Sequence, residues 1–333
     1  MSNKPAFALP TMKEIANIEK NGLRVASLFS GCGGSSLGYK LAGCDVIYAV
    51  EFVPEAIAAY KANHPNTYLD TRDVREVQAQ DILNQVGEID ILDGSPPCQS
   101  FSTAGARSKG WGKTKKYSGD VSQRSDDLFF EYARILKDLQ PKAFIAENVS
   151  GLVKGAAKGY FLDIIEALRN CGYRVKASVL DAQWLGVPQM RQRLFYVGFR
   201  NDLGLEPVFP SPLKYHYTVK DVLPHIKLVK FSGKANNYKA AGLNASPTIM
   251  ANDYERKETA YFSGGGWIET MQGERRQFTI DELKIICTFP SDFYLPGSLS
   301  EQWERLGRAV PPFLMRALAT VVSNQLLKVS IHA

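Results

Sequence analysis

The chain has 333 residues, enough for one large domain or two ordinary ones with a sizeable core. Hydrophobic residues make up 45% and charged residues 22% of it, which excludes an intrinsically disordered protein. The net charge of +6 has the sign that suits a nucleic-acid partner, although many soluble enzymes are equally basic.

The sequence has no recognisable targeting segment and no cysteine motif. No apolar run approaches the length of a membrane span, and the first 22 residues lack the apolar stretch of a signal peptide, so we expect a cytoplasmic protein without a membrane partner. The five cysteines are scattered and form no CxxC motif, which argues for reduced thiols and against a zinc site.

The first 200 residues alternate short apolar strands with helical segments, the pattern of a doubly wound, mostly parallel sheet. The predicted strands cover residues 24–29, 45–50, 89–92, 143–145, 174–180 and 194–199. The predicted helices between them cover residues 35–42, 54–63, 128–139 and 161–170. This α/β order predicts a Rossmann-like fold.

After residue 200 this rhythm stops. Residues 201–273 are rich in proline, glycine and aromatic side chains, which predicts a second, smaller and irregular domain. Helical order returns at Thr279, where Thr279 and Glu282 have the spacing of a capping box. A last helix is expected to start after Pro311 and Pro312 and to run to about Leu327.

A glycine-rich turn at residues 29–34 follows the first strand and opens a helix, so its backbone can approach a ligand closely. Glu51 lies 20 residues after Gly31, where a carboxylate can accept both ribose hydroxyls, or can simply be a solvated strand end. Asp73 could accept from an adenine amino group or be a solvated turn residue. The turn lacks the Lys-Ser/Thr of a P-loop, which favours an adenosyl ligand without a triphosphate.

Cys98 follows two consecutive prolines and an apolar strand, so its backbone direction is set before a ligand binds. A cysteine held in this way suits a nucleophile, whereas most cysteines are buried as small hydrophobic residues. The segment after it, residues 102–125, is rich in Gly, Ser, Lys and Arg and predicts a mobile flap.

Acidic and basic side chains follow later strands. Glu147 comes after the strand at residues 143–145 and is expected at the same sheet edge as Cys98, facing one crevice. Arg191 and Arg193 alternate in an extended segment, so both point to one side. The pair suits anion or phosphate contact, or ordinary surface ion pairs.

In this order the motifs resemble those of the cytosine-5 DNA methyltransferases of the bacterial modification type, over about residues 24–200 and 276–318. The similar segments are Ser27–Gly38, Pro96-Pro97-Cys98-Gln99, residues 127–131, Glu147-Asn148-Val149, Gln189-Met190-Arg191-Gln192-Arg193, Arg276–Phe293 and Leu306–Pro312. Two positions depart from the family pattern. Asp93-Gly94-Ser95 stands where a glycine pair is usual, and Arg308 stands where asparagine is usual.

The resemblance implies a class I S-adenosylmethionine-dependent methyltransferase domain at residues 1–200 and 274–333, with a target recognition domain at residues 201–273. The catalytic residues that it implies are Cys98, Glu147, Arg191 and Arg193. The implied cofactor-binding residues are Phe29, Ser30, Gly31, Gly33, Gly34, Glu51, Phe52, Asp73, Val74, Pro97 and Leu128. The flap would contact DNA through Ser102, Arg107, Lys109, Lys113, Lys115 and Lys116, unless it is only a solvated loop.

The implied reaction is methyl transfer to carbon 5 of a flipped-out cytosine in double-stranded DNA, through a covalent Cys98 adduct and without a metal. We expect the protein to be a monomer associated with the nucleoid. It would belong to a restriction-modification system, in which a cognate endonuclease acts separately. An RNA (tRNA) cytosine-5 methyltransferase is one alternative. A catalytically silent, S-adenosylmethionine-responsive DNA-binding regulator is another, against which the intact set of Cys98, Glu147 and Arg193 argues.

Overall fold

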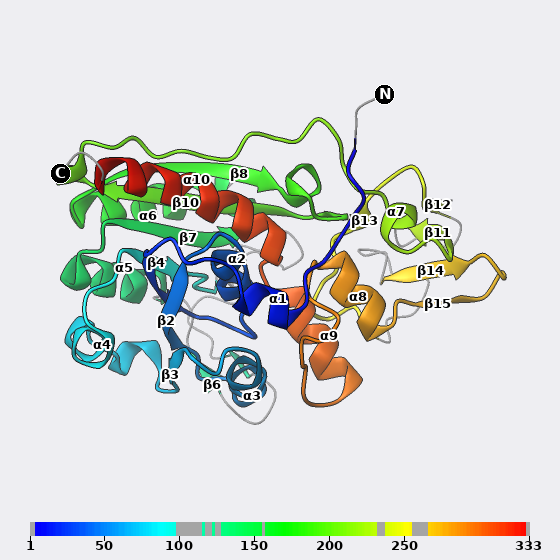
Figure 1. The fold of residues 1–333 in the computed structure, drawn as a ribbon, viewed down its shortest axis with the longest axis horizontal. Helices are drawn as coiled ribbons and strands as arrows, with labels where there is room; N and C mark the ends of the chain where they lie inside the picture. Colours follow the sequence, from blue (N-terminus) through cyan, green and yellow to red (C-terminus); the bar gives the residue numbers. More distant parts are fainter. Residues whose placement is uncertain are drawn as a thin grey trace.

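The structure is a computed structural model that describes residues 4–97, 115–116, 122–123, 128–154, 157–231, 237–254 and 266–330. A seven-stranded sheet with helices on both faces forms its larger part (Figure 1). The strand order is β3 (Tyr68–Asp70), β2 (Asp45–Val50), β1 (Arg24–Leu28), β4 (Ile91–Gly94), β7 (Ala143–Val149), β10 (Gln192–Arg200) and β8 (Tyr173–Asp181). β10 runs opposite to the other six strands, which are parallel to one another, so the predicted doubly wound, mostly parallel sheet is confirmed.

Side chains of the sheet alternate between two cores because successive residues of a strand point to opposite faces. Val25 and Ile91 enter the core that contains α2 (Gly34–Leu41) and α10 (Pro312–Ser330). Ala26, Leu28 and Leu92 enter the other core, whose helices are α4 (Ala79–Val86), α5 (Leu128–Leu139) and α6 (Lys158–Asn170). Apolar burial on both faces explains why these strands read as continuous apolar runs.

A second sheet lies in the smaller part of the molecule, at the right of Figure 1, and makes residues 201–273 more ordered than the sequence predicts. Its order is β12 (Tyr238–Ala240), β11 (Ile226–Lys230), β14 (Trp267–Thr270) and β15 (Arg275–Gln277), with antiparallel pairs throughout. Strands of three to five residues between glycines and prolines give too little alternation to detect. The sheet extends beyond residue 273, because β15 ends at Gln277.

A third core joins the two sheets. It contains Leu37 of α2, Ile226 and Ile268 of the small sheet, and Trp303 and Leu306 of α9 (Leu299–Arg308). The remaining helices and strands are α1 (Met12–Ala16), α3 (Pro54–Asn63), α7 (Val219–Val222), α8 (Ile280–Ile286), β5 (Lys115–Lys116), β6 (Ser122–Gln123), β9 (Gln189–Met190) and β13 (Ser246–Pro247). Short 3-10 helices cover Val74–Glu76, Ser150–Val153, Ala182–Leu185 and Asn201–Leu203.

The predicted start of α8 is confirmed in atomic detail. The Thr279 hydroxyl accepts from the backbone N–H of Glu282, and the Glu282 carboxylate accepts from the backbone N–H of Thr279 at 2.7 Å. The last helix begins at Pro312, one residue before the expected start, and continues to Ser330, three residues past the expected end. None of the helices in the described part of the chain is long and apolar enough to cross a membrane.

Candidate active site

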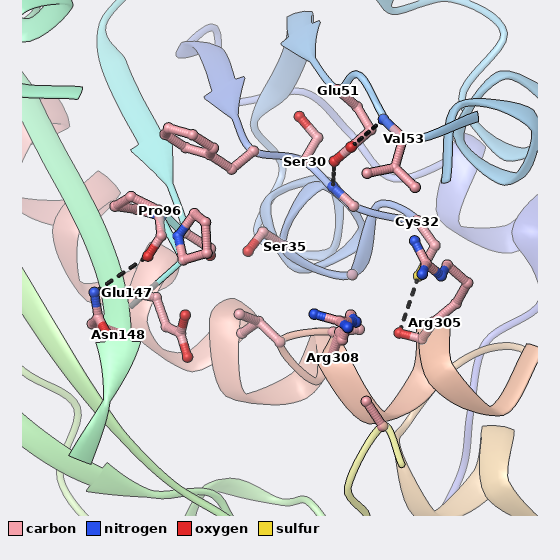
Figure 2. Close-up of a pocket in the computed structure, with 18 of the residues that line it drawn as sticks. Ser30, Cys32, Ser35, Glu51, Val53, Pro96, Glu147, Asn148, Arg305 and Arg308 are labelled. Carbon is pink, nitrogen blue, oxygen red and sulfur yellow. Dashed lines mark hydrogen bonds between the residues drawn. The ribbon is translucent and has the colours of Figure 1, made fainter. Parts of the chain in front are cut away.

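A cavity of about 410 Å³ opens at the carboxyl edge of the large sheet, where β1, β2, β4 and β7 end, and α9 lies across from them (Figure 2). The predicted site residues that line it are Phe29, Ser30, Gly31, Gly34, Glu51, Phe52, Val74, Pro97, Glu147, Arg191 and Arg193. Gly33, Asp73 and Leu128 do not line it. The chain therefore brings its separate motifs to one place.

Several predicted residues lie outside the described part of the chain, namely Cys98, Ser102, Arg107, Lys109 and Lys113. Lys115 and Lys116 form the short strand β5, which pairs with β6, but their side chains are not described. The roles assigned to all seven stay predictions. Pro97, the last described residue before Cys98, lines the cavity, so the chain leaves the described region at the cavity wall.

The glycine turn between β1 and α2 forms one end of the cavity, which we call the cofactor end. Gly33 has φ +97°, and a Cβ there would lie 2.2 Å from Nε2 of His64. A Cβ on Gly34 would lie 2.3 Å from the backbone oxygen of Val310. Only glycine fits such close contacts, and Phe29 also has a positive φ of 57°. The turn is thus packed tightly from behind and open toward the cavity.

Glu51 is fixed at the end of β2 by backbone donors. Its Oε2 accepts from the N–H of Gly31 at 2.7 Å, and its Oε1 accepts from Phe52 and Val53 at 3.0 and 2.9 Å. Burial raises the pKa of Glu51, while these N–H groups and Arg305 act in the opposite direction. The carboxylate therefore stands in one orientation at the cavity wall.

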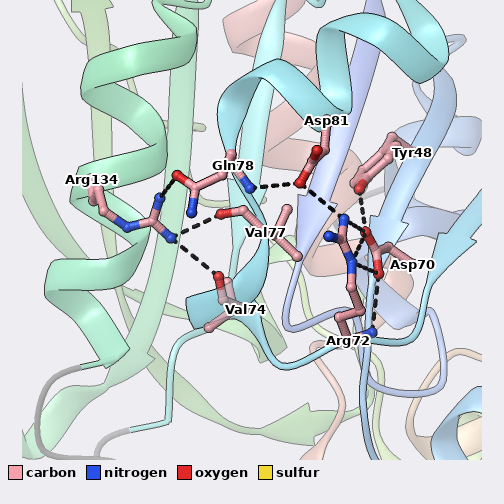
Figure 3. A network of polar contacts seen from close by, with 8 residues as sticks. All are labelled: Tyr48, Asp70, Arg72, Val74, Val77, Gln78, Asp81 and Arg134. Atoms are coloured by element: carbon pink, nitrogen blue, oxygen red, sulfur yellow. Dashed lines mark hydrogen bonds and ion pairs between the residues drawn. The ribbon is translucent and has the colours of Figure 1, made fainter.

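A polar network holds the chain between β3 and α4 beside this end (Figure 3). Arg72 donates to Asp70 at 2.6 Å and to Asp81 at 3.0 Å, and Tyr48 donates to Asp70 at 2.7 Å. Arg134 of α5 donates to the backbone oxygens of Val74 and Val77 (Figure 3). The network fixes the loop that carries Val74 to the cavity.

Two predicted cofactor residues have other contacts. Asp73 caps the 3-10 helix at Val74–Glu76, and its carboxylate accepts from the backbone N–H of Arg75 at 3.1 Å. Leu128 is fully buried in the core beneath the sheet. A contact of either side chain with a cofactor stays a prediction.

The opposite end of the cavity, which we call the base end, is built around an ion pair. Nε of Arg193 in β10 lies 3.0 Å from Oε1 of Glu147 in β7. Burial raises the pKa of Glu147, with Arg193 and Arg191 opposing the shift. Asn148 donates from Nδ2 to the backbone oxygen of Pro96 at 3.2 Å and so ties the proline step to β7 (Figure 2).

Arg191 has backbone partners. Its side chain is 1% exposed, and it donates from Nη1 to the backbone oxygen of Ile249 at 3.1 Å and from Nη2 to that of Gly307 at 2.9 Å. Gln189 also contacts Ile249, because its Oε1 accepts from the N–H of Ile249 at 3.3 Å. These bonds favour a positioning role, with Arg191 joining the small domain to α9.

Asp93, at the first departure from the family pattern, lies buried below the cavity. It accepts from the Ser27 hydroxyl at 2.7 Å and from the Tyr39 hydroxyl at 3.3 Å. Burial raises its pKa to about 7. A Cβ at the next residue, Gly94, would lie 2.5 Å from Tyr132, so that position accepts only glycine.

Two arginines of α9 line the cavity and have no counterpart in the predicted site. Arg308, the second departure, donates from Nε to Oε1 of Glu304 at 2.7 Å, so it meets an acidic neighbour. Arg305 is 5% exposed. Arg305 is two residues after Trp303 and directly before Leu306, so it lies on a different face of α9 from either, and its burial could not be known without the fold.

Comparisons with known proteins agree with this architecture. The sequence model of the C-5 cytosine-specific DNA methylase family matches residues 23–230 and 218–324. The Type II methyltransferase M.NgoPII of Neisseria gonorrhoeae is 31% identical over 92% of this chain and 97% of its own. The Type II methyltransferase M.FnuDI of Fusobacterium nucleatum is 37% identical over 69% of this chain and 62% of its own.

A solved structure extends the likeness to the fold. A prophage-encoded DNA modification methyltransferase from E. coli superposes with a TM-score of 0.68 at 21% identity, over 92% of this chain and 99% of its own. The fold therefore recurs at low sequence identity.

Proposed function

The chain belongs to the C-5 cytosine-specific DNA methylase family, and from this we propose that it transfers a methyl group from S-adenosylmethionine to carbon 5 of cytosine in double-stranded DNA. One observation carries the proposal. A single cavity has the glycine turn and Glu51 at one end and Pro97 with the Glu147–Arg193 pair at the other. A donor and an acceptor bound at these two ends would meet inside it.

The cofactor end fits an adenosyl ligand. Oε2 of Glu51 accepts only from Gly31 and keeps a lone pair that can accept a ribose hydroxyl, and Gly31 and Ser30 lie at the cavity wall. Phe52 and Val74 offer apolar surface for the adenine ring. When bound, S-adenosylmethionine supplies an electrophilic methyl group. The protein side chains then have only to activate the cytosine.

At the base end, the Cys98 thiolate would add to carbon 6 of the cytosine, and the electron pair of the 5,6 double bond becomes available at carbon 5. Glu147, whose pKa is raised, would donate a proton toward N3 and accept from the exocyclic amine. After carbon 5 has taken the methyl group, a base removes its proton. The double bond then reforms and expels the thiolate, so the enzyme is regenerated.

The substrate would be reached by flipping the cytosine out of the duplex, because carbon 5 is inaccessible inside it. We propose that the domain at residues 201–273, with its small sheet, recognises the DNA sequence, and that the lysines of residues 102–125 contact phosphates. We further propose that the protein is a monomer that works beside a separate restriction endonuclease; the support for a restriction-modification role is that its relatives are named Type II methyltransferases.

Transfer of labelled methyl groups from S-adenosylmethionine to duplex DNA and to tRNA tests the substrate directly. We expect incorporation into DNA alone, and bisulfite sequencing of DNA from cells that express the protein should give one short recognition sequence. Incorporation into tRNA alone would overturn the DNA assignment. Binding of S-adenosylmethionine without transfer to either substrate would indicate a regulator in place of an enzyme.

A further inference from the structure

Ser95 is a half-buried hydroxyl residue at the base end of the cavity, and the proposed reaction does not use it. The strands β4 and β7 pair in parallel with Gly94 opposite Ala146, so Ser95 and Glu147 are the next residues along the two strands. Residues that lie opposite each other on neighbouring strands project to the same side of a sheet. The side chains of Ser95 and Glu147 therefore lie beside each other, and both residues line the cavity.

The backbone on both sides of Ser95 is held in place. The N–H of Ser95 donates to the backbone oxygen of Leu28 in β1 at 3.3 Å. The backbone oxygen of the next residue, Pro96, accepts from Nδ2 of Asn148 in β7 at 3.2 Å (Figure 2). The proline ring also fixes φ at this step. The Ser95 hydroxyl therefore starts from a fixed place beside Glu147.

The charged and polar groups around Glu147 act on its carboxylate in different ways. Burial raises the pKa of Glu147, and the charges of Arg193 and Arg191 lower it. The Ser95 side chain adds a hydrogen bond to the carboxylate, which lowers this pKa further. Burial also raises the pKa of Asp93 in β4, and the nearby charge of Glu147 raises it further. Ser95 is the uncharged member of this group, so its effect depends on a short, directed contact.

We propose that Ser95 is a positioning residue, whose hydroxyl donates to the Glu147 carboxylate and holds its plane toward the cytosine. The proposal rests on the proposed function, since cytosine is the base inferred there. N3 and the exocyclic amine lie in the plane of the cytosine ring, so one carboxyl group engages both only when its own plane is aligned with them. The terminal torsion of a glutamate is broad, and the ion pair with Arg193 leaves it loosely set. A second contact from β4 restricts that torsion.

A titration of the Glu147 carboxyl group tests the contact without any substrate. Carbon-13 NMR of protein labelled at the glutamate carboxyl groups follows the titration, and Glu147→Gln assigns the signal by its loss. In Ser95→Ala we expect the pKa of Glu147 to rise by about 0.5 to 1 pH unit, because a hydrogen bond to the charged form is lost. Ser95→Thr keeps a hydroxyl and should restore most of the original value. A pKa that does not move in Ser95→Ala would overturn the proposal.

The pH profile of kcat/KM for methyl transfer then tests the positioning. A raised pKa keeps Glu147 protonated to higher pH, so in Ser95→Ala the fall of activity at high pH should move upward, while the maximum of kcat/KM drops about 3- to 10-fold. Ser95→Thr should recover most of both changes.

Ser178→Ala is the control. It removes a half-buried serine of β8, in the same sheet but outside the cavity, and should leave the profile unchanged. A lower maximum with an unmoved high-pH fall in Ser95→Ala would overturn the proposal and make Ser95 a structural residue. Absence of methyl transfer to DNA by the unaltered protein would overturn the proposed function and this inference with it, so the two failures are distinguishable.

Discussion

The two ends of the cavity are built in different ways. At the cofactor end the backbone positions the side chain, because the N–H groups of Gly31, Phe52 and Val53 hold Glu51 in one orientation. At the base end two charged side chains on neighbouring strands, Glu147 and Arg193, hold each other. A backbone cradle is suited to binding, whereas a titratable pair can change its protonation during a reaction. Substitutions at the two ends should therefore separate binding from turnover.

The largest expected effect is that of Cys98→Ala, which should separate turnover at the base end most completely from binding at the cofactor end. Methyl transfer should be abolished while S-adenosylhomocysteine still binds, because the cofactor end is untouched. DNA that contains 5-fluorocytosine should trap the unaltered protein covalently, since fluorine does not leave as a proton does. Denaturing electrophoresis measures the adduct, and trapping that persists in Cys98→Ala would assign the nucleophile to another residue.

Glu147→Gln should lower turnover about 100-fold or more, the usual contribution of a positioned acid, with little effect on cofactor binding. The raised pKa of Glu147 also predicts pH dependence. The protonated form donates to N3, so activity should fall as pH rises through the pKa of Glu147, which gives the pH profile a high-pH limb. Glu147→Gln should lose this high-pH limb.

The pH profile of kcat/KM measures this effect. Arg193→Lys, which alters the other partner of the Glu147–Arg193 ion pair, is the matched variant. Arg193→Lys keeps the charge but loses the guanidinium plane, so the high-pH limb should shift and still be present. An unchanged high-pH limb in Glu147→Gln would assign that limb to a different group.

At the cofactor end, Glu51→Gln should act on binding. The amide can no longer accept through both ends from Gly31, Phe52 and Val53, and hydrogen bonds to a charged group are lost. We expect the Kd of S-adenosylhomocysteine to rise about tenfold, while kcat at saturating cofactor stays within about twofold. Glu76→Gln, outside the cavity, is the control. A fall in kcat with unchanged Kd would contradict the division between the ends.

The sequence predicted those residues at the two ends of the cavity that stand in recognisable local patterns. The glycine turn, Glu51 and Glu147 follow strands whose apolar runs are easy to recognise, so the large sheet brings them to one edge. The small sheet was missed because its strands are short and because its central pair, β11 with β14, joins segments far apart in the sequence. Arg305 was missed because its burial depends on where α9 packs against the turn.

Arg308→Asn has the smallest expected effect and tests where the base end stops. Arg308 lines the cavity, but it is 38% exposed at its side chain and already pairs with Glu304 one helical turn away. An exposed pair of this spacing contributes little to stability, about 0.3–0.5 kcal/mol. We therefore expect kcat/KM to stay within about tenfold, which corresponds to roughly 1.4 kcal/mol. Glu304→Gln removes the same ion pair from its other side and also the carboxylate beside the buried Arg305, so it should give the larger change of the two. A loss of several orders of magnitude in Arg308→Asn alone, with cofactor binding and folding intact, would place Arg308 in contact with the reacting groups and extend the base end onto α9.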